Sequence, residues 1–390
     1  MKNAYFLSAA LAVSAAIGAS PASAQTTLRI GVVASLSGPG TAWGNAILGA
    51  AQFAADDVNA KGGLEVGGKK YTVSIVSYDD KYKANDAQTA MNRLIFDDKI
   101  NIVLGPVGTA PALAALPLAS ENKVLTMTMA WGDKALGPNL PYSFRPVVPA
   151  QVFAEPQIRW VVGKLGSKRV GALFPNDATG QDASNVFDAA YTKAGAKLVA
   201  KESFERERID FVPLLTRVLA QNIDLFEIGG TPPDSAGMLI KQLREMGYKG
   251  PIVSTAGDAV AEIVRIAGTN NTDNIYVHRS ANTDVPAVKQ YAERYSARFK
   301  APMNGFSPFF YASMEMLFES MKNAGTVSDT EKIRAALLSL NGFPTMVGKA
   351  TWMGQAKWGS NQQLSVPVYV GLLKNGQASI VATCTPEKCE

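Results

Sequence analysis

The sequence predicts an α/β protein built from two doubly wound lobes with mainly parallel sheets. Segments typical of strands and of helices alternate along most of the chain, a pattern that indicates parallel sheets covered by helices. The alternation restarts after a segment bounded by prolines at 141–149. The chain has 390 residues, 47% of them hydrophobic, which is more than one core usually serves and therefore favours two domains.

The first series of alternating segments begins at Leu28. Short apolar runs predict strands, and apolar residues three and four positions apart predict helices. Lys61-Gly62-Gly63 follows the first helix, and glycine is common just beyond a helix C-terminus. The predicted strands are 28–33, 71–76, 102–104 and 124–127, and the predicted helices are 45–59, 86–96 and 111–119.

The second series begins at Val152, and Asp210 is the expected N-cap of one of its helices. Beyond residue 348 the pattern changes to antiparallel strands, with Asn375-Gly376 as a hairpin turn. The predicted strands are 170–174, 198–202, 225–228, 252–254, 349–352, 366–373 and 379–382. The predicted helices are 152–165, 183–194, 211–220, 238–246, 259–267, 288–299, 309–322 and 332–338.

The first 24 residues have the layout of a cleavable secretory signal peptide. Lys2 gives a positive start, an apolar stretch runs from Tyr5 to Ile17, and Ala22-Ser23-Ala24 supplies the small residues of a cleavage site. The apolar stretch spans only about 20 Å as a helix, against ~30 Å for a bilayer core. We expect export, with cleavage after Ala24. Gln25 rather than a cysteine follows the cleavage site, so no lipid anchor is expected there.

Charge and cysteine content exclude some classes of partner. The formal net charge is +5, and the positive residues are scattered, so a nucleic-acid groove is not expected. The two cysteines, Cys384 and Cys389, both lie in the last seven residues. In an exported protein this spacing favours a short disulfide loop. A metal site is the alternative, but two thiols without nearby histidines make a poor one, and we expect no metal.

Signals for catalysis are weak, and we expect neither an enzyme nor a cofactor. His278 is the single histidine, so a histidine-based zinc site or triad would depend on it alone. The chain has no G-x-S-x-G, Walker A or H-E-x-x-H motif. Asp79 and Asp80 are adjacent at a strand end, where neighbouring side chains point to opposite faces, so turn chemistry explains them equally well.

Doubly wound sheets bind ligands at the carboxyl ends of their strands. This rule selects the loops 35–44, 78–80, 105–109, 128–133, 175–180, 229–234 and 255–258. Thr109 opens a helix, where its hydroxyl and the free N–H groups either bind a carboxylate or simply cap the helix. Trp43 and Trp131 lie in two of these loops, and a place in the pocket wall is favoured over core packing for both.

Several motifs in order resemble the leucine/isoleucine/valine-binding protein family. They are Ser37-Gly38-Pro39 with Trp43-Gly44, Asn59-Ala60-Lys61-Gly62-Gly63, Tyr78-Asp79-Asp80, Asp210-Phe211 and Gly229-Gly230. The resemblance implies a type I periplasmic binding fold with a three-crossing hinge and lobes that close on a solute. It also implies a periplasmic location and delivery to an ABC permease and its ATPase in the inner membrane. Thr109, Ala130 and Gly132 match positions that bind the ligand carboxylate in this family, and Trp43 matches an aromatic residue that packs on the ligand.

The second lobe departs from the family pattern. Thr179, Thr231 and Ala256 occupy places where amino-acid binders have tyrosine, tyrosine and glutamate around the ligand ammonium group. Asp258 or Asp234 are the possible substitutes for the missing carboxylate. A buried ammonium group without a carboxylate is unfavourable, so hydrophobic or aromatic acids and amides stand beside amino acids as expected ligands.

The resemblance also sets the expected organisation of the chain. Lobe 1 is expected at 25–145, rejoined by about 280–345, and lobe 2 at 146–279, rejoined by about 346–375, with a C-terminal tail at 376–390. The protein is expected to be a monomeric receptor for a small carboxylate-bearing solute. A ligand-sensing receptor subunit of the same fold and a secreted α/β enzyme are the alternatives.

Overall fold

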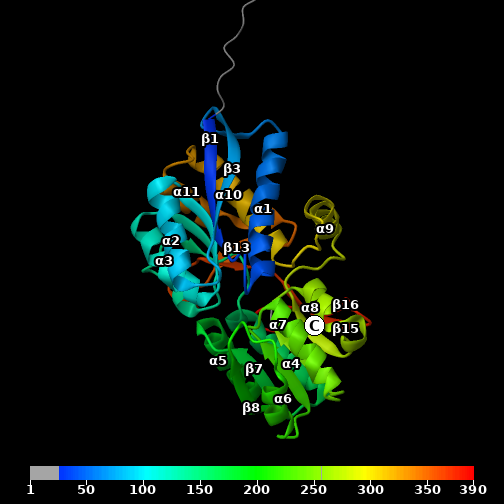
Figure 1. Cartoon of the computed structure of the whole chain (residues 1–390). Helices are drawn as coiled ribbons and strands as arrows, with labels where there is room; N and C mark the ends of the chain where they lie inside the picture. Colours follow the sequence, from blue (N-terminus) through cyan, green and yellow to red (C-terminus); the bar gives the residue numbers. More distant parts are fainter. Residues whose placement is uncertain (1–25, 256) are drawn as a thin grey trace, which may run out of the picture.

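The computed structural model describes residues 26–255 and 257–390, which form two lobes, each built on its own sheet (Figure 1). The predicted fold class is confirmed. The signal peptide predicted at 1–24 and Ala256 of the predicted site lie outside the described residues. Within the described ranges, no helix has the length and apolar character needed to cross a membrane.

The first lobe contains a six-stranded sheet with strand order β2-β3-β1-β4-β5-β6. Its neighbouring strands are parallel, except for the antiparallel pair β2 and β3. The strands are β1 (Thr26–Ala34), β2 (Leu64–Val66), β3 (Lys69–Asp79), β4 (Ile102–Val107), β5 (Leu125–Met129) and β6 (Ser143–Phe144). Strands β4 and β5 are buried throughout, so neither carries the charged residues that an exposed face would tolerate.

Helices from two distant parts of the chain surround this sheet (Figure 1). They are α1 (Thr41–Ala60), α2 (Ala84–Asn92), α3 (Thr109–Glu121), α9 (Pro286–Phe299), α10 (Ser307–Ala324) and α11 (Thr330–Ser339), with α9 packed beside α1. A π-helical turn at Arg93–Asp97 extends α2. A side chain on Gly44 of α1 would collide with the backbone of Ser35, so glycine lets α1 approach the end of β1 closely. This approach places Trp43 at the edge of the lobe that faces its neighbour.

The second lobe contains a seven-stranded sheet with order β16-β15-β11-β10-β9-β7-β8. The pairs β11–β15 and β15–β16 are antiparallel, and the other neighbours are parallel. The strands are β7 (Arg169–Pro175), β8 (Lys197–Phe204), β9 (Leu225–Gly229), β10 (Ile252–Thr255), β11 (Ile275–Arg279), β15 (Val368–Lys374) and β16 (Gln377–Cys384). The helices are α4 (Ala150–Leu165), α5 (Ala178–Lys193), α6 (Val212–Leu219), α7 (Pro233–Glu245) and α8 (Val260–Ala267).

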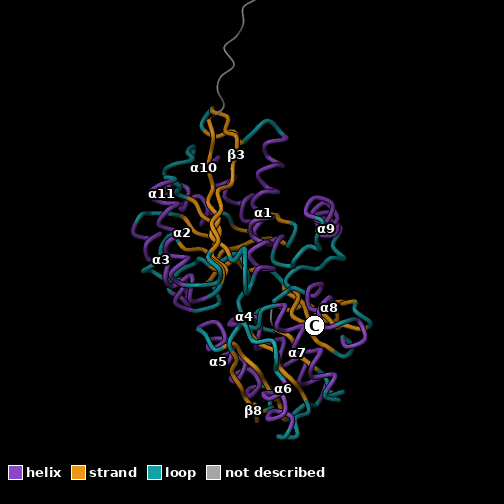
Figure 2. Tube along the Cα trace, in the orientation of Figure 1, coloured by secondary structure: helices purple, strands orange, loops and turns teal. Residues whose placement is uncertain are grey.

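The chain crosses between the lobes at 145–150, 279–286 and 365–368. A small antiparallel sheet of β12 (Asn341–Thr345), β13 (Gly348–Met353) and β14 (Gln363–Ser365) lies beside the crossings, with the short helix α12 (Gln355–Trp358). A bridge between Arg145 and Gln363 joins the first crossing to β14, directly ahead of the third crossing. Figure 2 shows the strands of both lobes, in orange, flanked by helices in purple.

Two expectations about the last part of the chain need correction. Gln377–Cys384 form β16, the edge strand of the second sheet, so 376–390 is not a separate tail. Strands β13 and β14, within the segment 346–375 assigned to lobe 2, pair with β12 and not with the second sheet. Local apolar pattern identifies such strands but not their partners, because pairing depends on contacts distant in the sequence.

Candidate functional site

A small cavity lies between the two lobes, and its empty volume of about 300 Å³ includes space that is open to solvent. Most of its lining comes from the first lobe, at the carboxyl ends of strands and in the loops that follow them, as expected for doubly wound sheets. The lining residues are Trp43, Tyr82, Val107, Gly108, Met129, Trp131 and Phe306 from the side of the first lobe, and Thr179 and Gly230 from the second lobe. The wall is therefore mainly apolar, with a few polar atoms at its edges.

Three of the predicted site residues line this cavity: Trp43, Trp131 and Thr179. The Trp43 side chain is 5% exposed, and its indole Nε1 is buried without a hydrogen-bond partner among the residues that the structure describes. Trp131 packs edge-on against Phe153, with ring centroids 5.8 Å apart. Both tryptophans thus combine pocket wall and core packing, and Trp43 keeps an unused donor.

Thr109 lies at the start of α3 and connects the two lobes. Its Oγ1 accepts a hydrogen bond from the Gly132 backbone N–H at 3.0 Å and donates to Asp182 Oδ2 at 3.1 Å. Its backbone N–H donates to Thr179 Oγ1 at 3.1 Å. The alternative in which Thr109 simply caps its helix is wrong, because the helix has no side-chain cap and the hydroxyl bonds to the opposite lobe.

Arg145 supports the loop that contains Ala130, Trp131 and Gly132. Its guanidinium Nη1 donates to the Ala130 carbonyl at 2.9 Å and to the carbonyls of Trp131 and Gly132 at 3.3 Å each. Burial lowers the pKa of Arg145 to about 9. Sequence reasoning missed this residue, although a lone arginine in the predicted first crossing was a signal that could have found it. Ala130 is buried, and its carbonyl faces Arg145 rather than the cavity.

The predicted residues of the second lobe are mostly engaged within the protein. The Thr231 hydroxyl donates to the Gly229 carbonyl at 3.3 Å. Asp258 is buried, forms an ion pair with Arg279 at 2.7 Å and accepts from the Ser280 N–H at 2.7 Å. Asp258 therefore fixes the backbone at the start of the second crossing.

Asp234, the other possible ammonium partner, lies 3.5 Å from Arg265 at an exposed position. Among the described residues, no carboxylate lines the cavity. The structure thus gives neither Asp258 nor Asp234 the free carboxylate that an ammonium group needs.

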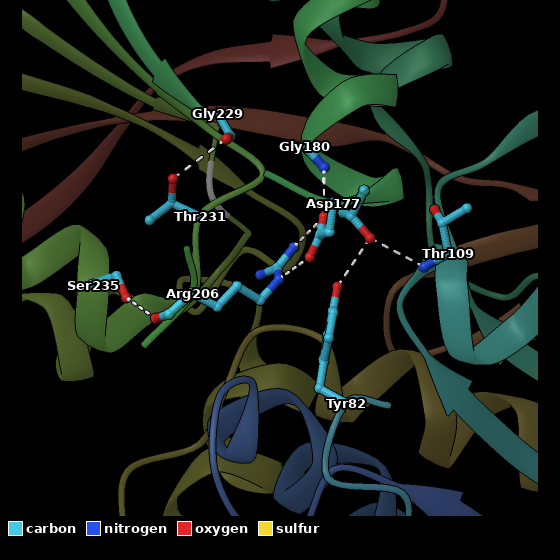
Figure 3. Close-up of polar contacts among 9 residues, drawn as sticks. Tyr82, Thr109, Asp177, Gly180, Arg206, Gly229, Thr231 and Ser235 are labelled. Atoms are coloured by element: carbon cyan, nitrogen blue, oxygen red, sulfur yellow. Dashed lines mark hydrogen bonds and ion pairs between the residues drawn. The ribbon is translucent and has the colours of Figure 1, made fainter. Parts of the chain in front are cut away.

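Tyr82 and Arg206 form a contact between the lobes that sequence reasoning missed (Figure 3). The Tyr82 hydroxyl lies 3.0 Å from Thr179 Oγ1, and the Arg206 guanidinium stacks 4.3 Å from the centre of the Tyr82 ring. Arg206 also forms an ion pair with Asp177, which caps α5 by accepting from the Gly180 N–H at 2.9 Å. Burial raises the pKa of the Tyr82 phenol, so it stays neutral.

The adjacent acids and the single histidine have structural partners. Asp79 accepts from the Leu36 N–H at 2.9 Å, and Asp80 accepts from Ser35 Oγ at 2.7 Å and the Tyr82 N–H at 2.9 Å. Asp80 thus fixes the turn that presents Tyr82. His278 stacks on Phe153, with ring centroids 3.8 Å apart, and burial lowers its pKa to about 3.

Comparison with known proteins agrees with this geometry. A family model described as periplasmic binding protein matches residues 27–378. The chain belongs to this family, whose members include the branched-chain amino acid receptors. The Leu/Ile/Val-binding protein BraC3 of Rhizobium johnstonii is 28% identical over 84% of this chain and 88% of its own length.

Two solved structures share the fold of this periplasmic binding protein. The branched-chain amino acid transporter substrate binding protein LivJ of Streptococcus pneumoniae, in complex with isoleucine, has a TM-score of 0.79 at 23% identity. The match covers 94% of this chain and 99% of that one. A solute binding protein of an ABC transporter from R. palustris, in complex with benzoate, has a TM-score of 0.80 at 20% identity, covering 92% and 97%. The shared fold therefore accommodates ligands with and without an amino group.

Proposed function

We propose that this protein is the periplasmic substrate-binding component of an ABC import system that takes up a small carboxylate-bearing solute. The solute is held between the lobes and handed over chemically unaltered to the permease and ATPase in the inner membrane. The proposal includes export through the signal peptide at 1–24, action as a monomer and lobes at about 25–145 with 280–345 and 146–279 with 366–384. The bond between Cys384 and Cys389 in the structure suits an oxidising compartment.

The observation that carries the proposal is the mainly apolar cavity between the lobes, with Thr109 beside it at a helix start. The helix N-terminus favours an anion, and the Thr109 hydroxyl, which donates to Asp182 in this structure, would be a donor for the anion once that bond is exchanged. Trp43 Nε1, which has no partner within the described ranges of the chain, is a second donor at the cavity wall. An apolar body with one anionic or acceptor group fits this arrangement.

The same geometry favours hydrophobic or aromatic acids over α-amino acids. Asp258 and Asp234 are both paired with arginines, and Asp182 already accepts from the Thr109 hydroxyl, so an ammonium group in the cavity would have to compete with these partners for a carboxylate. Burying an unpaired charge is strongly unfavourable. Isoleucine, its deaminated analogue 3-methylpentanoate, and benzoate therefore form a test set that separates the two ligand classes.

Calorimetric titration of the wild-type protein with these three compounds tests the proposal. We expect the acids without an amino group to bind more tightly than isoleucine. Thr109→Ala should weaken their binding at least about tenfold, because a hydrogen bond to a charged group is lost. Thr216 is an exposed helical threonine far from the cavity, so Thr216→Ala is the matched control and should leave the Kd of all three compounds unchanged. Isoleucine binding more tightly than 3-methylpentanoate would refute the preference for acids without an amino group.

A further inference from the structure

Asp182 of the second lobe reaches the hydroxyl that the proposed function assigns to the ligand. It lies on α5, and its Oδ2 accepts from Thr109 Oγ1 at 3.1 Å. The Thr109 oxygen already accepts from the Gly132 N–H. A hydroxyl has one proton to donate, so the donor capacity of Thr109 is fully used by Asp182. The partner of the binding hydroxyl is therefore a carboxylate of the protein itself.

The surroundings of Asp182 are unfavourable for a second negative charge. Its pKa is raised, first by burial and further by the negative charges of Asp133 and Asp177, while the hydrogen bond from Thr109 and the charge of Arg145 lower it. A ligand carboxylate bound to the same hydroxyl would lie within roughly 4–6 Å of Asp182, where like charges repel appreciably. The ligand acid must therefore either displace the Asp182 carboxylate from Thr109 or bind despite the repulsion from its negative charge.

A neutral amide meets no such conflict. Its NH₂ group can donate to the Asp182 carboxylate or to the remaining lone pair of Thr109, with Asp182 in place. Resting on the proposed function, we propose that Asp182 is a specificity-determining residue. It competes with the ligand carboxylate for the Thr109 hydroxyl, and it thereby lowers the affinity for acids relative to matched primary amides.

The test compares acid and amide pairs of equal shape on wild type and Asp182→Asn. The probes are benzoate with benzamide, and 3-methylpentanoate with 3-methylpentanamide, titrated by calorimetry. We expect the acid-to-amide ratio of Kd to fall by about tenfold in Asp182→Asn, because a neighbouring negative charge is removed while the side-chain shape is kept.

Asp188→Asn is the matched control. Asp188 lies on the same helix, and its carboxylate faces Lys201 at 3.7 Å, away from the cavity. The Asp188→Asn substitution removes the same charge from the same helix but at a position away from the cavity, so it should leave the acid-to-amide ratio of Kd unchanged. An equal fall of the ratio in Asp188→Asn would mean that net charge alone is responsible, and the proposal would be overturned.

The outcomes separate this inference from the proposed function. Wild-type binding of acids with an unchanged ratio in Asp182→Asn overturns the role of Asp182 and leaves the receptor function standing. Acids that bind only Asp182→Asn support the competition but contradict a carboxylate as the native ligand. Acids that bind neither protein overturn both proposals.

A readout without any ligand checks the interlobe contact. Asp182→Ala and Thr109→Val should each increase the radius of gyration of the unliganded protein in X-ray scattering, because each removes the same hydrogen bond between the lobes. Scattering curves of both variants that coincide with wild type would overturn the contact, and the competition with it.

Discussion

At the scale of single residues, Trp43 combines deep burial with an unused donor. Its Nε1 has no partner among the described residues, and its ring lines the cavity. A buried donor left unpaired is unfavourable for the fold, whereas a ligand acceptor would satisfy it. Trp43 is therefore expected to contribute to binding more than to stability.

Trp43→Phe should weaken binding of benzoate by about five- to tenfold, the size expected for one lost hydrogen bond. Because no described residue pairs with Nε1, the urea midpoint should fall only by the packing that is lost with the smaller ring. Calorimetry and urea denaturation measure the two quantities. Trp160→Phe, on α4 outside the cavity, is the control. A large loss of stability with unchanged affinity would assign Trp43 to the core alone.

Glu227 predicts a dependence of stability on pH. It is fully buried on β9, accepts from Tyr191 and Thr255 at 2.6 Å each, and burial raises its pKa from 4.5 to about 7. The folded state therefore binds this proton more tightly than the unfolded state. The contribution to the free energy of unfolding falls as pH rises from 4.5 to about 7, by roughly 3 kcal/mol in total, and is constant above.

Glu227→Gln removes this titration, so its stability relative to wild type should rise between pH 5 and pH 8. Urea denaturation at several pH values measures the difference, and the comparison cancels the contributions of Asp80, Glu315 and His278. Glu245→Gln, at an exposed position on α7, is the control. A stability difference that is independent of pH would show that Glu227 does not titrate in this range.

Part of the site could be predicted from the sequence because it lies where strand ends meet loops. Trp43, Trp131 and Thr179 were found in this way. Met129 lies within the predicted loop 128–133 but was not singled out, because it ends a buried strand and resembles any core residue. Phe306 was missed because it reaches the cavity from a segment more than 150 residues beyond the other lobe-1 positions. Asp182 required knowledge of how the lobes meet, which no local pattern contains.

At the scale of elements, β16 depends on the last residues of the chain. It is the edge strand of the second sheet, and the bond between Cys384 and Cys389 closes a loop directly after it. Residues Thr383 and Glu390 exchange backbone hydrogen bonds at 2.8 and 2.9 Å. The loop therefore anchors an edge that would otherwise fray.

Replacing both cysteines with serine should lower the free energy of unfolding by roughly 2 kcal/mol, from the loop entropy of so short a closed segment. Thermal unfolding should shift down by a few degrees. A reductant should destabilise wild type but not the double variant, which is the internal control. A reductant effect of equal size on both proteins would show that the bond is not responsible.

The positions of helices and strands along the chain could be predicted better than the pairing of strands into sheets. Strands β4, β9 and β10 are buried throughout because both of their faces are covered, and their sequences are mainly apolar without the alternation of a half-exposed strand. The start of α1 was placed four residues late, at Asn45 instead of Thr41, because the glycines before it read as a turn. β2 was missed, since its three residues carry too little pattern.

At the scale of the whole molecule, closure depends on contacts made across the cleft. Tyr82 from the first lobe meets Arg206 and Thr179 from the second, beside the bond from Thr109 to Asp182. Each contact exists only when the lobes approach, so each shifts the equilibrium towards the closed form. The Arg206 guanidinium depends most on its shape among these groups, because its plane stacks on the Tyr82 ring while its nitrogens pair with Asp177.

Arg206→Lys keeps the charge but loses the planar stacking, and should therefore favour the open form. The unliganded variant should have a larger radius of gyration than wild type by X-ray scattering. At saturating benzoate the two should coincide, because bound ligand restores closure. Arg217→Lys, an exposed arginine of the same lobe paired with Glu202, is the control. Equal radii of gyration of unliganded wild type and Arg206→Lys would show that Arg206 does not stabilise the closed form.

The described chain starts with β1 at the outer end of one lobe and finishes after β16 in the other (Figure 1). A fluorescent donor attached ahead of Thr26 and an acceptor attached after Glu390 would thus be carried by different lobes. Their energy transfer would change whenever the cleft opens or shuts. The connectivity makes this protein a ready scaffold for an optical sensor of whichever metabolite it captures.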